Sequence, residues 1–158
     1  MASSKPDLSG VRLIFYALLA GQLLFAAVVI FLLSQQEEEA RYLLGPGMDL
    51  PVIAAYTLAM VFLSRFIDGM WKKQIPNVLR FKRPALGHYR NNVIVRLAIL
   101  EGAGLLTIVM AFVTRNPQLL IATLFVLGAF WLARPREEEM RERYGSQVVK
   151  ESDSQGVR

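Results

Sequence analysis

Four long apolar stretches, separated by short polar segments, dominate the pattern of hydrophobic and polar positions along the chain. They cover residues 11–34, 51–70, 93–114 and 117–133. Because a helix rises about 1.5 Å per residue, a run of about 20 apolar residues matches the ~30 Å hydrocarbon core of a bilayer. The pattern therefore predicts an all-α integral membrane protein, a four-helix bundle built from two antiparallel transmembrane hairpins.

The polar residues after the fourth run predict a short helix outside the membrane, over residues 136–144. Glu137 precedes Arg141 by four residues and Glu139 precedes Arg143 by four, which is the favourable order for ion pairs along a helix. We therefore expect this helix to lie in solvent, stabilised by its own side chains.

The remaining polar segments set the domain limits. The first helix is expected to continue through residues 35–44 until Gly45 and the following Pro and Gly end it. Beyond residue 145 too few apolar residues remain to fold. We expect one membrane domain over residues 1–145 and a disordered tail over residues 146–158.

Lysine and arginine are unevenly distributed among the loops. The first loop holds only Arg41 and the third only Arg115, whereas the middle loop and the chain from Arg134 onward each hold six. Basic residues concentrate on the cytoplasmic side of membrane proteins. Both termini and the middle loop are therefore predicted to be cytoplasmic.

The middle loop, residues 72–92, is the strongest candidate for an interaction surface. Pro76 and Pro84 are expected to limit helical structure there to short pieces. Such a loop attracts anionic lipid headgroups by about 1 kcal/mol per basic residue. No nucleic-acid motif surrounds these residues, so we expect no nucleic-acid partner. The basic residues of the loop are Lys72, Lys73, Arg80, Lys82, Arg83 and Arg90.

Five polar side chains within the predicted spans are expected to form an intramembrane cluster. Counted by helix rise from the cytoplasmic boundary of the membrane, Glu101 and Arg65 lie about 12 and 7 Å deep. Asp68 and Arg96 lie about 3 and 4 Å deep by the same count. Each couple is therefore expected to form an ion pair between spans two and three. Gln22 of span one is a candidate neighbour of Glu101. An ionisable group in a span needs protein, water or protonation around it, so Glu101 is either a structural anchor or a proton or cation site.

Two pairs of small residues predict close helix packing. Ala17 and Gly21 in the first span, and Ala98 and Gly102 in the third, each show the small-xxx-small spacing that lets two membrane helices approach closely. We expect these faces to pack inside the bundle.

Composition restricts the chemistry. Hydrophobic residues make up 54% of the chain, which agrees with a membrane protein. Cysteine is absent and His88 is the only histidine, so disulfides and thiolate sites are excluded, and one histidine builds no zinc site unaided. No phosphate-binding glycine loop or hydrolase motif is present. We expect no enzymatic activity, no metal and no cofactor.

Four short segments resemble a known family over roughly residues 79–144. They are Tyr-Arg at 89–90, Val-Ile-Val-Arg-Leu-Ala-Ile-Leu-Glu-Gly-Ala at 93–103, Val-Thr-Arg-Asn at 113–116 and Arg-Pro at 134–135. The chain resembles a group of small, uncharacterised bacterial four-helix membrane proteins. The resemblance implies a location in the bacterial inner membrane and no assigned activity.

A weaker likeness concerns Leu-Glu-Gly-Ala-Gly at residues 100–104, which is similar to the carboxylate-bearing helix of ATP synthase c subunits. That likeness implies that Glu101 would carry a proton or sodium ion, with Gln22 as a possible second ligand. The leading expectation is a structural or accessory subunit of a membrane protein complex or homo-oligomer. The alternative is proton or cation translocation through Glu101.

Overall fold

A computed structural model of the chain describes residues 8–35, 48–80 and 85–145, and all regular elements in these ranges are helical. The all-α prediction is confirmed for these residues. The predicted continuation of the first helix beyond Gln35 and the predicted disordered tail lie outside them. In chain order the elements are α1 (Ser9–Ser34), α2 (Asp49–Arg80), α3 (Ala85–Thr114), the 3-10 turn η1 (Pro117–Leu119), α4 (Leu120–Leu132) and α5 (Glu137–Tyr144).

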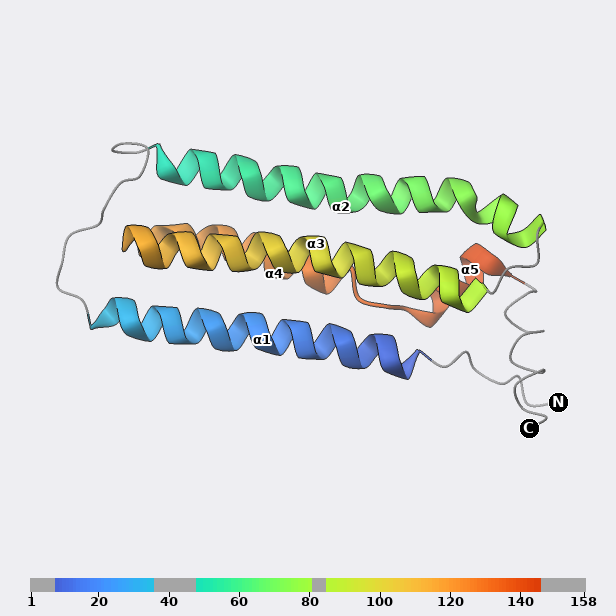
Figure 1. Cartoon of the computed structure of the whole chain (residues 1–158), viewed down its shortest axis with the longest axis horizontal. Coiled ribbons are helices and arrows are strands. Elements are labelled where there is room, and N and C mark those ends of the chain that lie inside the picture. Colours follow the sequence, from blue (N-terminus) through green and yellow to red (C-terminus); the bar gives the residue numbers. More distant parts are fainter. Residues whose placement is uncertain (1–7, 36–47, 81–84, 146–158) are drawn as a thin grey trace.

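α3 occupies the centre of the bundle and packs against α1, α2 and α4. Helices that follow one another from α1 to α4 run in opposite directions (Figure 1). α1 and α2 lie on opposite sides of α3, so the expected first hairpin is not a packed pair. The reason is that the inner side of α3 offers the small buried residues Ala103, Gly104 and Ala111, which let its neighbours come close.

The core is apolar and lies between α1, α3 and α4. The ring of Phe15 stacks on that of Phe130 with centroids 5.3 Å apart, and Leu97 is fully buried beside them. The outward faces are apolar as well, since Phe62 and Phe125 are 71% and 67% exposed. Soluble proteins rarely expose large contiguous apolar patches, so this surface is suited to a bilayer.

Three of the helices, α1, α2 and α3, are long and apolar enough to cross a membrane. A fourth span is obtained if the short helical segment Pro117–Leu132 and α5, which meet at an angle of 56°, are taken as one bent unit. Pro135 lies in the non-helical link between them, where it has no backbone N–H to continue a helix. The result is a multi-pass helical architecture with a bent last segment.

α2 and α3 are longer than predicted, so the prediction of a long middle loop between them is wrong. α2 continues past residue 70 to Arg80 with Pro76 inside it, and α3 begins at Ala85 rather than near residue 93. A proline inside a helix removes one backbone hydrogen bond and crowds the preceding turn. Lys72, one turn before Pro76, is paired with Asp68, and Ile75 packs on the core, so the turn before the proline is held against the bundle.

Candidate functional site

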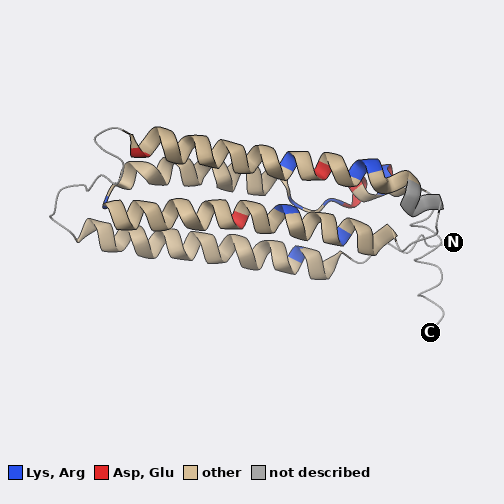
Figure 2. Ribbon diagram, turned by 45° about the horizontal axis from the view of Figure 1, so that its top comes forward, with Lys and Arg blue, Asp and Glu red and all other residues tan. Residues whose placement is uncertain are grey.

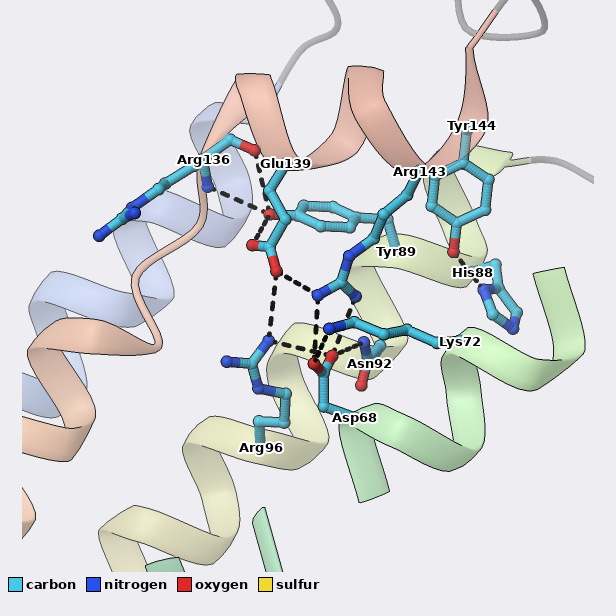
Figure 3. Close-up of polar contacts among 10 residues, drawn as sticks. All are labelled: Asp68, Lys72, His88, Tyr89, Asn92, Arg96, Arg136, Glu139, Arg143 and Tyr144. Carbon is cyan, nitrogen blue, oxygen red and sulfur yellow. Dashed lines mark hydrogen bonds and ion pairs between the residues drawn. The ribbon is translucent and has the colours of Figure 1, made fainter. Parts of the chain in front are cut away.

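Charged side chains gather at the end of the bundle where α1 and α3 begin, α2 ends and α5 lies, here called the polar end (Figure 2). Asp68 of α2 is the centre of this region (Figure 3). Arg143 binds both of its carboxylate oxygens, with N···O distances of 2.9 and 3.1 Å. The amide of Asn92 donates to Oδ1 at 2.8 Å, and Nη1 of Arg96 donates to the same oxygen at 3.2 Å. Lys72 Nζ lies 3.0 Å from Oδ2.

The cluster is assembled by helical periodicity. Each of three helices contributes two side chains one turn apart, a spacing that places both on one face. The set meets where the three faces converge, and we call it the Asp68 cluster. Its members are Asp68 and Lys72 on α2, Asn92 and Arg96 on α3, and Glu139 and Arg143 on α5.

Glu139 ties the start of α5 to the cluster. Its carboxylate pairs with Arg143 one turn later and lies 3.8 Å from Nη1 of Arg96. The Tyr89 hydroxyl accepts a hydrogen bond from the backbone N–H of Arg136 at 3.1 Å. The same hydroxyl can donate its proton to the Arg136 carbonyl or to Glu139. Tyr89 therefore fixes the backbone at Arg136, the residue that precedes α5.

An aromatic contact lies at the other end of α5. His88 Nδ1 and the Tyr144 hydroxyl are hydrogen-bonded (Figure 3). The ring centroid of Trp71 lies 4.8 Å from that of His88. Burial raises the pKa of Tyr144 to about 12, so its phenol is neutral at physiological pH and can donate to His88. This contact holds the last turn of α5 against α2 and α3.

The Asp68 cluster is a network of ion pairs that holds α2, α3 and α5 together, here called the helix lock. Asp68 and Glu139 carry two negative charges, and Lys72, Arg96 and Arg143 carry three positive ones, all within ion-pair distance. Removing one member of a buried pair leaves its partner uncompensated. Across the three described ranges, no group of three or more His, Cys, Asp or Glu side chains is placed to hold a metal ion.

The depth argument correctly predicted one of two ion pairs. The Asp68–Arg96 contact is present at 3.2 Å. The Glu101–Arg65 pair is wrong: Arg65 is exposed, Glu101 is half-buried, and neither forms an ion pair within the described part of the chain. Similar depth did not suffice, because depth along a helix does not specify which way a side chain faces. Arg65 lines a cleft at the polar end together with Arg96.

Gln22 does lie next to Glu101, but it contacts the backbone. Its amide Nε2 donates to the carbonyl oxygen of Glu101 at 3.1 Å, and no bond joins it to the carboxylate. The Gln22 side chain fits because it lies over Gly104, where an added Cβ would be 2.7 Å from Nε2. The small-xxx-small spacing did not single out Gly104, although the Gln22 contact requires a glycine at this position.

The small-residue prediction is wrong within this chain. Ala17, Gly21, Ala98 and Gly102 are all exposed, and a Cβ added to either glycine would meet nothing within 4 Å. Small-xxx-small spacing places residues on one face without saying which face is inside. In α3 the inside is set by Arg96 and its neighbours, on the opposite side of the helix.

The predicted basic residues divide into four groups. Lys72 belongs to the Asp68 cluster, while Lys73 and Arg90 are exposed at the polar end. Arg80 is the last residue of α2. The two others, Lys82 and Arg83, lie outside the described residues.

Sequence reasoning missed Tyr89, Asn92, Glu139 and Arg143 as members of this site. It also expected Glu139 and Glu137 to pair only within α5. Glu139 does pair with Arg143, but Glu137 pairs with Arg12 of α1 at 2.7 Å. The signal that could have found the cluster is the recurrence of polar residues at i and i+4 on three elements near one end.

Comparison of the chain with protein-family models, curated proteins and solved structures found no match. Its function is therefore inferred from the geometry of the polar end.

Proposed function

We propose that the chain is a non-catalytic protein of the bacterial inner membrane, with four spans and both termini in the cytoplasm. It acts as a structural or accessory subunit that presents its polar end to membrane-protein partners or anionic lipid. The observation that carries this proposal is the Asp68 cluster, which joins α2, α3 and α5 at one end of an apolar bundle.

The cluster supports a holding role because its ionic groups bond to one another. Arg143 donates two hydrogen bonds to Asp68, and the Arg96 side chain is 4% exposed. Such an arrangement stabilises one relative position of three helices. The surface of these helices is thereby held in a fixed geometry. It includes the exposed residues Lys73 and Arg90.

The charge of the polar end supports a cytoplasmic location. Lysine and arginine concentrate there, and juxtamembrane basic residues are attracted to the anionic cytoplasmic leaflet. Partner proteins would meet the same surface, because the opposite end carries few charged residues among those described.

Photo-crosslinking in native membranes tests the proposal. A photoreactive residue at Lys73, on the polar end, is compared with one at Val52, near the start of α2 at the opposite end. We expect a discrete protein or lipid adduct from position 73 that is absent from position 52 and weakened by Asp68→Asn. The same adducts from both positions, or an adduct unaffected by Asp68→Asn, would contradict a presenting role for the polar end.

Cation or proton translocation through Glu101 is the second candidate, and one observation favours it. Gln22 Oε1 is buried without a hydrogen-bond donor next to the Glu101 backbone, and the Glu101 carboxylate has no ion partner among the described residues. Carbodiimide labelling of Glu101 that falls with rising pH, or that sodium protects against, would support translocation. Absence of labelling in the folded protein over a broad pH range would exclude an exchangeable site.

A further inference from the structure

A cleft of about 270 Å³ lies at the polar end, between α2, α3 and the segment that begins α5. Its size is close to the lower limit of about 300 Å³ for small-molecule pockets. The charged lining consists of three arginines and three glutamates, of which the Asp68 cluster uses only Glu139 and part of Arg96. Its charged residues are Arg65, Arg96, Arg136, Glu138, Glu139 and Glu142.

The arginines offer unused donors. Within residues 8–35, 48–80 and 85–145, the side chains of Arg65 and Arg136 form no hydrogen bond or ion pair. Arg96 bonds Asp68 and Glu139 through Nη1 alone, and its Nε is buried without an acceptor. Figure 3 shows its other terminal nitrogen directed to the side on which the Arg136 guanidinium projects. Guanidinium groups bind phosphate oxygens in bidentate geometry.

The glutamates offer unused acceptors. Glu138 and Glu142 stand one turn apart on α5, are exposed, and have no ion pair in the part of the chain that the structure describes. Two carboxylates at this spacing can accept hydrogen bonds from one ammonium group. They also repel a second negative charge, so the cleft suits a ligand with one phosphate and one ammonium better than a purely anionic one.

The order of these groups matches a phospholipid headgroup. Arg65 stands three residues before Asp68 on α2, and Arg96 stands four after Asn92 on α3, so both lie toward the apolar middle of the bundle. Leu132, at the end of α4, adds an apolar contact to the lining. In a lipid the phosphate is likewise next to the acyl-bearing glycerol, and the amine is farther out.

We infer that this cleft binds the headgroup of a zwitterionic glycerophospholipid with a primary ammonium. The phosphate is held by Arg65, Arg96 and Arg136, and the ammonium by Glu138 and Glu142. The inference rests on the proposed function, because it requires the polar end to lie at the bilayer surface.

Native mass spectrometry of the full chain in detergent tests the inference, with phosphatidylethanolamine, phosphatidylglycerol and phosphatidylcholine as probes. We expect the ethanolamine lipid to be retained about tenfold better than the others. Arg136→Gln should lower its retention about tenfold. The control Arg134→Gln, whose guanidinium lies over Trp131 and not in the cleft, should leave retention unchanged.

The glutamates are tested by selectivity. Glu138→Gln combined with Glu142→Gln should abolish the preference for ethanolamine without lowering retention of the glycerol lipid. Equal retention of all three lipids by the unmodified chain, or equal effects of Arg134→Gln and Arg136→Gln, would overturn the inference. Tighter binding of soluble phosphoethanolamine than of the lipid would also overturn it, because the site would then be one for a free phosphate compound. These outcomes leave the crosslinking result at Lys73 unchanged, so the two proposals fail separately.

Discussion

At the Asp68 carboxylate, the cost of removing a charge from water is offset by the bonds around it. The residue is 5% exposed, and its oxygens receive bonds from an amide, two guanidinium groups and an ammonium. Neutral donors alone would leave the negative charge uncompensated, whereas this mixture of charged and neutral donors compensates it. The mixture satisfies the geometry of both oxygens and places Asp68 at the centre of the helix lock.

Asp68→Asn should therefore destabilise the protein by about 3–5 kcal/mol, because it removes the carboxylate charge that Arg96 and Arg143 share. Lys72→Met is the control, since that lysine is half-exposed and such pairs contribute about 0–1 kcal/mol. Thermal unfolding in detergent measures both. Equal losses from the two variants would show that Asp68 is not the centre of the lock.

Two glycines of α3 provide a matched comparison. Gly104→Ala should lower the melting temperature, because the new methyl group would displace the Gln22 amide from the Glu101 carbonyl. Gly102→Ala, two residues earlier and open to its surroundings, should be neutral or slightly stabilising, since alanine favours a helix by up to about 1 kcal/mol over glycine. Combining Gly104→Ala with Gln22→Ala should cost less than the sum of the two changes. Additive losses would mean that the two residues do not compete for space.

At the scale of elements, α5 is held by contacts to three other helices. Arg143 and Glu139 bind α2 and α3, and Glu137 pairs with Arg12 of α1. An isolated helix of eight residues is not stable in water, so α5 depends on these contacts. The bend between α4 and α5 directs the last helix back over the ends of its neighbours.

Arg143→Gln should release α5 while leaving the apolar core intact. Hydrogen–deuterium exchange in residues 137–144 should become faster, with little change in α3. Arg141→Gln removes the same charge from an exposed position on the same helix and should not change exchange. Protection of α5 that persists in Arg143→Gln would show that other contacts dock it.

The elements could be predicted more reliably than their rotations. Helix positions followed from apolar runs, and the Asp68–Arg96 contact followed from depth. Spacing could not show that Ala98 and Gly102 face outward, because a helix with apolar residues all round has no sequence signal for its inner side. The buried Arg96 sets that side through Asp68. Arg143 could not be predicted as a partner, since nothing local indicated that α5 folds back over α2.

At the scale of the whole molecule, an apolar bundle ends in one charged surface. Exposed aromatic and aliphatic side chains cover the outer faces, and the ion pairs described above lie at the polar end. This asymmetry supports the proposal that the polar end lies at the cytoplasmic face of a membrane.

Cysteine accessibility tests that central claim most directly, because the chain contains no native cysteine. Single cysteines replace Lys73 at the polar end and Met48 at the opposite end, and right-side-out vesicles are treated with a membrane-impermeant maleimide. The account predicts labelling of Met48→Cys in intact vesicles and of Lys73→Cys only after permeabilisation. Labelling of Lys73→Cys in intact vesicles would contradict the account, because it would place the Asp68 cluster outside the cytoplasm.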